Sequence, residues 1–341
     1  MLISICQDIF SNSSNDSYLD NLLTFFRLGK HQLILNNPDD FLSFENSTWK
    51  KQIKGDDLKL ITRGLKHPQK YKREIIISEN EFSLEEAFLY LDQPLVVLVE
   101  NKEYEPPFFN AIINKFDDYE IEDAHKNKWW KYEMFAGSSV EQVINGELEN
   151  EFNNTCFKKE KFKYLRYFVI MDSDKTHINM INNTLDYKIE FLKSVKVDYH
   201  VLHKREKENY LPGSKLNSKN IEYFNCFLRV FKDNGKRQRD FFDIEKGFNK
   251  KNKSDGNWKN NRKEEADFFE INDIGDKDWE ILKKGVLDRD NFKSTFSKDF
   301  NSVEKSEFLQ VIKYQPLIKS EIDGEERNEY EHIVNEIKRL L

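Results

Sequence analysis

Short apolar runs along the chain predict a set of buried parallel strands. The clearest are Leu95–Val99 and Tyr167–Met171, each about as long as one strand that is buried on both faces. Trp130–Phe135 and Tyr199–Leu202 predict two further strands, and Met1–Cys6 predicts another at the beginning of the sequence. Polar residues follow each run, so the pattern predicts strands that alternate with other elements.

Helices are predicted between these strands. Ser83 and Glu86 have the spacing of a capping box, which predicts a short helix that continues to Leu91. Pro106 and Pro107 favour the start of another helix. The apolar spacing predicts the remaining helices: one with Phe108, Ile112 and Ile113 on its buried face, one beginning near Ser138, one with Ile178, Ile181, Leu185, Ile189 and Leu192, and a last one that buries Tyr330, Ile333, Val334 and Ile337. Helices that alternate with strands predict parallel βαβ units.

The expected fold class is therefore α/β, with one parallel sheet and flanking helices. We expect three parts: residues 1–82, a mixed α/β region without an assigned role; residues 83–247, which carry the sheet; and residues 248–341, a basic loop followed by a mostly helical region. A chain of 341 residues is long enough for two or three domains.

Composition places the chain among globular proteins. Charged residues make up 34% of it, the net charge is −7, and 28 Phe, 14 Tyr and 5 Trp supply an aromatic interior. No apolar run approaches the roughly 20 residues that a membrane span needs. Cys6, Cys156 and Cys226 are isolated and odd in number, which argues against a disulfide framework and against a cysteine zinc site. These features predict a cytoplasmic protein without membrane contact.

Acidic residues stand where the predicted strands end. Glu100 follows the first of the two clear apolar runs, and Asp172 and Asp174 follow the second. Because ligands of open α/β sheets bind beyond the carboxyl ends of the strands, these side chains can face one crevice. In an extended chain Asp172 and Asp174 would point to one side, with Ser173 opposite. Magnesium takes oxygen ligands, usually one or two carboxylates with waters and substrate phosphates, so the pattern predicts a magnesium site.

A third acidic segment completes a family resemblance. The last predicted strand is followed by the segment Arg205-Glu206-Lys207-Glu208-Asn209-Tyr210-Leu211. The order of strand-Glu, strand-Asp-x-Asp and a later acidic motif resembles a Toprim domain, which topoisomerases, primases and a set of nucleases share. The third segment is similar to the Arg-Glu-x-Glu-Asn-Tyr-Leu segment in Toprim domains of the OLD (overcoming lysogenization defect) nuclease class and of related bacterial anti-phage effectors. The resemblance covers about residues 90–250 and implies a Toprim-like sheet.

The resemblance implies a role for each of the acidic residues. Glu100 would be a metal ligand or a base, and Asp172 and Asp174 would be metal ligands. Glu206 and Glu208 would ligate a second metal or orient the ligands, with Glu208 favoured because it directly precedes Asn-Tyr.

Two further positions are carried over from the family pattern. Toprim domains usually have Gly after the first Glu, where this chain has Asn101. They often have an Asp four or five residues on, and Glu105 holds the nearest matching position, which makes it a candidate metal ligand. Lys246 is the candidate for the basic residue that often assists after the third motif in the OLD class.

These residues together predict a nuclease that depends on a divalent metal. Mg²⁺ or Mn²⁺, as two ions, would activate a water and stabilise the leaving oxygen of a phosphodiester. We expect a toxic effector of a bacterial anti-phage defence system that a partner or trigger controls. The alternative is a non-catalytic Toprim-fold interaction subunit of a defence complex, in which the departures at Asn101 and Glu105 mark a decayed site.

The sequence also defines what the nuclease would need from elsewhere. It has no Gly-x-x-x-x-Gly-Lys-Ser/Thr loop and hence no Walker ATPase of its own. The chain is then either a stand-alone effector or one half of a two-gene system in which an ABC-type ATPase subunit acts in trans. Three questions stay open. One is whether the substrate is DNA, messenger RNA or transfer RNA, and another is what triggers the protein. The third is the oligomeric state, for which a homo-oligomer is one possibility.

Other residues have both a functional and a structural interpretation. The basic stretch Lys246–Lys263, which includes Trp258, is a phosphate-binding surface or a solvated loop. For His200 and His203, the functional interpretation is contact with phosphate and the structural one is support of the fold. For Trp129 and Trp130, the functional interpretation is stacking on bases and the structural one is a place in the core.

Overall fold

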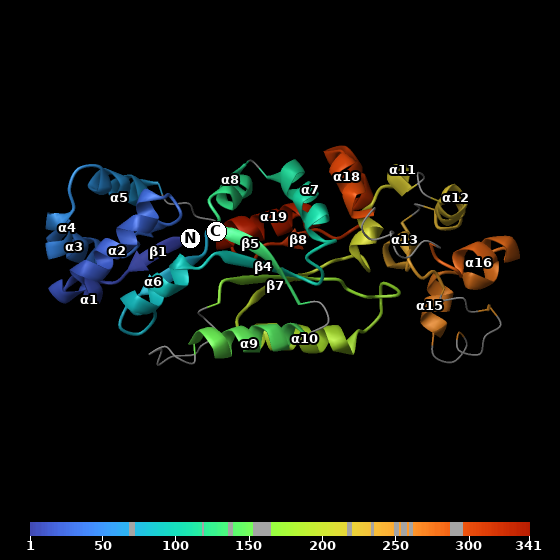
Figure 1. Ribbon diagram of the computed structural model, residues 1–341, viewed down its shortest axis with the longest axis horizontal. Coiled ribbons are helices and arrows are strands. Elements are labelled where there is room, and N and C mark those ends of the chain that lie inside the picture. The colour runs from blue at the N-terminus through green and yellow to red at the C-terminus, as the bar shows by residue number, and fades with distance from the viewer. Residues whose placement is uncertain are drawn as a thin grey trace.

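The computed structural model describes residues 1–67, 72–117, 119–135, 139–152, 165–216, 220–232, 235–248, 252–253, 258, 262–286 and 296–341. The fold is α/β, with parallel sheets flanked by helices (Figure 1). An N-terminal lobe, a central sheet and a cluster of short helices follow one another along the longest axis of the molecule.

The central sheet has four parallel strands in the order β5-β4-β6-β7. Val99 pairs with Met134, and Met171 pairs with Val201, so the carboxyl ends of the strands lie at one edge. The strands are β4 (Leu95–Val99), β5 (Trp130–Met134), β6 (Tyr167–Met171) and β7 (Asp198–Val201).

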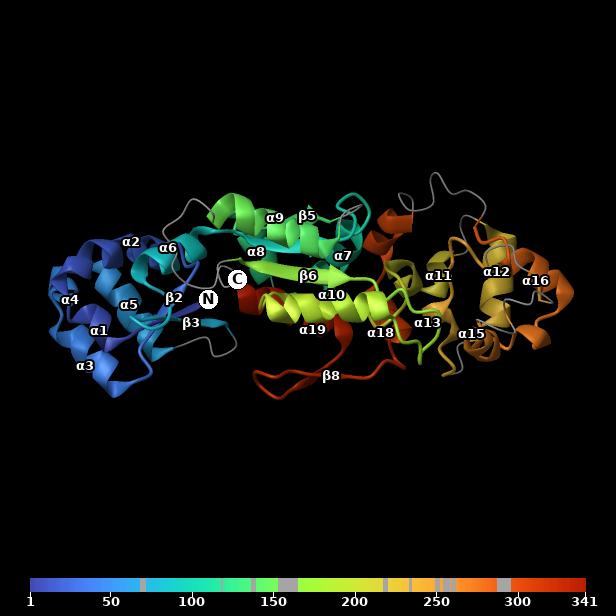
Figure 2. The same ribbon diagram turned by 90° about the horizontal axis from the view of Figure 1, so that it is seen from below.

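Helices cover both faces of this sheet, which explains why β4 and β6 are apolar throughout. Leu95, Val97 and Val99 of β4 face one core, whereas Leu98 faces the other. Figures 1 and 2 show α7, α8 and α19 on the first face and α9 and α10 on the second. Their bounds are α7 Pro106–Phe116, α8 Glu120–Lys126, α9 Val140–Phe152, α10 Asn183–Ser194 and α19 Glu329–Leu340.

The N-terminal lobe contains a second parallel sheet, in the order β2-β1-β3. Its apolar residues belong to the same core as the α9–α10 face of the central sheet. The lobe consists of β1 (Leu2–Ile5), α1 (Gln7–Phe10), η1 (Ser13–Asn15), α2 (Asp16–Arg27), β2 (Gln32–Ile34), α3 (Pro38–Asn46), α4 (Thr48–Gln52), α5 (Asp56–Lys66), β3 (Glu74–Ile77) and α6 (Leu84–Asp92).

The helical cluster at the other end packs around aromatic rings. Phe248 stacks on Trp279, and Trp258 meets both rings edge-on. The chain then returns through α18 and a short antiparallel hairpin to α19, which packs on α7 and α8. The elements are η3 (Lys207–Tyr210), α11 (Gly213–Leu216), α12 (Ile221–Val230), α13 (Gln238–Phe241), α15 (Lys263–Phe268), η4 (Ile271–Asp273), α16 (Asp276–Leu282), η5 (Phe300–Ser302), α18 (Lys305–Val311), β8 (Ile318–Lys319) and β9 (Glu326–Arg327).

Most of the predicted elements are confirmed. The strands at 95–99 and 167–171 have the predicted bounds, and Ser83 and Glu86 form the capping box of α6. The final helix buries Tyr330, Ile333, Val334 and Ile337 as predicted. Residues 136–138 lie outside the described part of the chain, so the expected start near Ser138 is not placed; α9 is described from Val140.

One helix begins later than the apolar spacing predicts. Ile178 and Ile181 were expected on its buried face, but they precede α10 and are 43% and 78% exposed. The Asn182 side chain accepts a hydrogen bond from the Leu185 amide and thereby caps the helix after both residues.

Candidate metal centre

Three carboxylates meet at the carboxyl edge of the central sheet. Glu100 directly follows β4, Asp172 directly follows β6, and Glu105 precedes the first turn of α7. A carboxylate oxygen of each lies within 4.8 Å of one from each of the other two. This acidic triad of Glu100, Glu105 and Asp172 could bind a metal ion.

A tight turn holds Glu105 against the end of β4. Its two carboxylate oxygens accept hydrogen bonds from the backbone N–H groups of Glu100 and Asn101, each at 3.1 Å. The Asn101 side-chain oxygen accepts from the N–H groups of Glu103 at 2.8 Å and Tyr104 at 3.1 Å. The two positions that depart from the family pattern, Asn101 and Glu105, therefore build this turn together.

The triad is electrostatically costly without a cation. Burial and then the charges of Glu100 and Glu105 raise the pKa of Asp172 well above its usual range. Burial raises the pKa of Glu105 to about 7, and burial and the charge of Asp174 raise the pKa of Glu100. Carboxylates that repel one another in a buried site bind protons, or a positive ion in their place.

The third motif contributes a buried ion pair beside the triad. Lys207 and Glu208 of η3 are both almost fully buried, and the Lys207 ammonium lies 3.3 Å from a Glu208 carboxylate oxygen. Burial lowers the pKa of Lys207, but the charges of Glu208, Asp172 and Glu105 outweigh it and raise that pKa overall. The charge of Glu208 likewise contributes to the raised pKa values of Asp172 and Glu105. Lys207 and Glu208 thus share one electrostatic environment with the triad.

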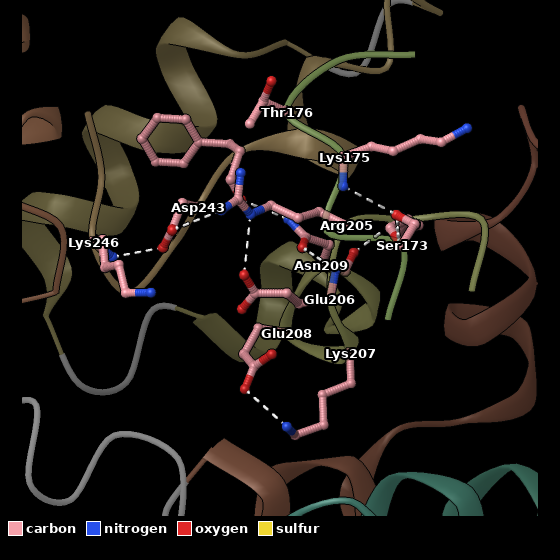
Figure 3. Close-up of polar contacts among 12 residues, drawn as sticks. Ser173, Lys175, Thr176, Arg205, Glu206, Lys207, Glu208, Asn209, Asp243 and Lys246 are labelled. Atoms are coloured by element: carbon pink, nitrogen blue, oxygen red, sulfur yellow. Dashed lines mark hydrogen bonds and ion pairs between the residues drawn. The ribbon is translucent and has the colours of Figure 1, made fainter. Parts of the chain in front are cut away.

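Glu206 acts on the triad through its charge on Glu100, but its contacts are with a second group of charges. The Arg205 guanidinium donates to Glu206 and to Asp243, each at 3.0 Å, and bridges the two carboxylates (Figure 3). Lys246 contacts this group through its backbone N–H, which donates to Asp243 at 2.7 Å. The candidate basic residue of the third motif is thus held beside Asp243, while Lys207 occupies the acidic site.

The Asn-Tyr pair fixes the third motif in place. The Asn209 amide donates to the backbone carbonyls of Arg239 and Phe242, and the Tyr210 hydroxyl donates to Glu329 at 2.6 Å. Glu329, at the start of α19, also accepts from the His200 ring at 2.9 Å and from the His203 N–H at 2.7 Å. The structural interpretation of His200 is therefore correct.

Asp174 does not join the triad in the expected way. The extended chain predicted for 172–174 ends at Asp174, which has a φ of 51°, and the Asp174 N–H donates to the Arg205 carbonyl. Ser173 is buried, and its hydroxyl donates to the Lys204 carbonyl at 2.8 Å. Asp174 is exposed and acts on the triad through its charge on Glu100.

Two tryptophans with a functional interpretation are core residues: Trp258 of the basic stretch, and Trp130, one of the two candidates for base stacking. Trp258 is buried between Phe248 and Trp279, and the Arg262 guanidinium lies over its ring. Trp130 is buried and its ring N–H donates to the Ile121 carbonyl. Neither ring is accessible to a nucleobase.

A cavity of about 350 Å³ adjoins the third motif. Glu208 lies on its wall, together with the basic residues Lys204, Lys232 and Arg237 and apolar side chains such as Leu228. Tyr314, which is half exposed, also lines it. The cavity combines apolar and cationic surface next to the acidic residues.

The donor set fits a hard divalent cation. The triad supplies carboxylate oxygens only, and burial together with their mutual repulsion raises the pKa of Asp172 and Glu105 although Lys207 opposes the rise. Within the described residues, no other group of three or more His, Cys, Asp or Glu side chains has this spacing.

Sequence reasoning missed Lys207, Asp243 and Glu329. Lys207 stands between two acidic residues of the third motif, which was the only signal for it. Glu329 is far away in the chain and reaches the motif through the packing of α19.

Comparisons with protein-family models, with curated proteins and with solved structures find no match for this chain. In the described part of the chain, no helix is both long and apolar enough to cross a bilayer.

Proposed function

We propose that this protein is a nuclease that hydrolyses phosphodiester bonds in nucleic acid with the help of Mg²⁺ or Mn²⁺. The convergence of Glu100, Glu105 and Asp172 at the carboxyl edge of a parallel sheet carries the proposal. The order of the acidic motifs supports a Toprim-like domain of the OLD nuclease class. In that case the protein acts as a controlled effector of bacterial anti-phage defence, with an ABC-type ATPase as the partner in trans.

The arrangement of the site gives each residue a part in the chemistry. Glu100, Glu105 and Asp172 would hold the cation, and the hydrogen bonds from the Glu100 and Asn101 amides orient Glu105 toward it. A bound divalent ion supplies Lewis-acid stabilisation of the phosphate and a water that ionises near neutral pH. Lys207 supplies a further positive charge beside the same carboxylates.

The turn at Asn101 and Glu105 argues against a decayed site. Four backbone N–H groups donate to these two side chains, so both residues have a specific structural task at the triad. A scaffold that had lost its metal would gain nothing from keeping one buried and two partly buried carboxylates that repel one another.

The cavity beside Glu208 supports a polymeric nucleic-acid substrate. Lys204 and Arg237 are paired with Asp240, and Lys232 adds a further positive charge for a backbone phosphate, while the apolar wall can accept a base or sugar. A strand that occupied the cavity would reach Glu208, whose charge acts on Asp172 and Glu105.

Cleavage by the purified protein tests the proposal. Supercoiled plasmid, linear DNA and total RNA are incubated with Mg²⁺, Mn²⁺ or EDTA, beside Asp172→Asn and the matched control Asp186→Asn. Asp186 is exposed on α10, outside the triad. We expect metal-dependent cutting that falls at least about 100-fold in Asp172→Asn and is unchanged in the control. Cutting that survives in Asp172→Asn would overturn the proposed site.

A further inference from the structure

Lys207 is an unusual neighbour for a site that binds divalent cations. Its side chain is only 5% exposed, and its ammonium lies 3.3 Å from Glu208, whose side chain is 3% exposed (Figure 3). Removing a buried ammonium from a buried carboxylate leaves an uncompensated charge, which is strongly destabilising. The Lys207–Glu208 pair is thus a fixed part of the site.

The contacts around Lys207 also indicate how many metal ions the site can hold. In the described part of the chain, Glu100, Glu105 and Asp172 bring carboxylate oxygens within 4.8 Å of one another, whereas a Glu208 oxygen lies 3.3 Å from the Lys207 ammonium. A second cation beside Glu208 would be repelled by that ammonium. In two-metal nucleases the second cation lies about 3.5–4 Å from the first and shares carboxylates with it. Here an ammonium acts on Asp172, Glu105 and Glu208 together.

We propose that Lys207 takes the place of a second metal ion, so that the centre binds one divalent cation, at Glu100, Glu105 and Asp172. The Lys207 ammonium is then the second positive charge of the site, and Glu208 is its counter-ion and not a metal ligand. This inference rests on the proposed function, because it concerns the same metal centre. It replaces the two-ion arrangement predicted from the family resemblance.

Counting bound Mn²⁺ tests this inference without reference to cleavage. Electron paramagnetic resonance and titration calorimetry give the number of ions and their affinity for the unchanged protein, Lys207→Gln and Lys207→Arg. We expect one ion in the unchanged protein and in Lys207→Arg, since arginine keeps the charge. In Lys207→Gln we expect a second ion beside Glu208, or at least about tenfold tighter binding of the first, because a repelling charge has been removed.

The outcomes separate this inference from the proposed function. Two ions in the unchanged protein, or equal number and affinity in Lys207→Gln, would overturn the role of Lys207 and leave the metal centre intact. No bound ion in the unchanged protein would overturn both. Should Lys207→Gln fail to fold by circular dichroism, the counts for the unchanged protein and Lys207→Arg decide. Lys193→Gln, on the exposed surface of α10, is the control and should not change the count.

Discussion

Glu105 couples the acidic site to the stability of the metal-free protein. Its folded-state pKa is about 7, mainly because of burial, whereas an unfolded chain has a value near 4.5. Between these pH values the folded state keeps a proton that the unfolded state releases, so the free energy of unfolding falls as pH rises from 4.5 to 7. One unit of pKa shift corresponds to about 1.4 kcal/mol, and we expect a loss on the order of 1–3 kcal/mol. Urea unfolding in EDTA at pH 5 and at pH 7.5 measures this loss in the free energy of unfolding.

Two variants attribute this pH dependence to Glu105. Glu105→Gln cannot ionise and should show a clearly smaller difference between the two pH values. Glu103→Gln, which changes an exposed carboxylate of the same turn, should behave like the unchanged protein. An equal pH dependence in Glu105→Gln and the unchanged protein would contradict the raised pKa of Glu105.

At the residue scale, the sequence predicted the acidic residues better than their partners. Glu100 and Asp172 follow apolar runs, so the geometry of parallel strands was enough to bring them together. Glu105 came from the family pattern, since nothing in the spacing shows that its oxygens accept two backbone amides. Lys207 had no predicted role, because its burial depends on contacts of Asn209 and Tyr210 with distant segments.

At the scale of elements, α19 supports the third motif through one carboxylate. Glu329 is 1% exposed, and it accepts from the Tyr210 hydroxyl, the His200 ring and the His203 N–H. Burial raises the pKa of Glu329, but the hydrogen bonds from His200 and Tyr210 and the charges of His200 and His203 outweigh it and lower that pKa overall, so Glu329 is a buried anion with three donors. We expect Glu329→Ala to lower the free energy of unfolding by about 3–5 kcal/mol, because the donors lose their partner.

Urea unfolding of Glu329→Ala and of a surface control checks this value. Glu190→Ala breaks an exposed ion pair with Lys193 on α10 and should cost less than about 1 kcal/mol. Similar losses in the two variants would show that α19 does not stabilise the motif through Glu329.

Elements were predictable where burial and local capping agree. The strands β4 and β6 are apolar at every position because helices cover both faces, and their bounds were predicted correctly. Ile178 and Ile181 continue the apolar spacing of α10, but the Asn182 cap ends the helix before them. Local hydrogen bonding thus decided a boundary that apolar periodicity alone placed wrongly.

At the scale of the whole molecule, the N-terminal lobe and the central sheet form one core. Ile3 and Ile75 of the lobe belong to the same apolar cluster as Leu98 and Val169 of the sheet. Polar contacts join the same parts, because the Arg73 guanidinium donates to Asp198 at 2.7 Å and its N–H donates to the Arg339 carbonyl. A division of the chain near residue 82 would therefore cut through buried contacts.

We expect the lobe and the sheet to unfold in one cooperative transition for this reason. Differential scanning calorimetry should give a single peak for the unfolding of the lobe together with the sheet. The calorimetric and van't Hoff enthalpies of that peak should agree. A chain of residues 83–341 should lose the peak or aggregate, because the apolar cluster that contains Leu98 and Val169 would lose its members from the lobe and expose apolar surface. Two separate peaks for the intact chain, with a stable 83–341 product, would instead mean that the lobe is an independent unit and that the metal centre needs no support from it.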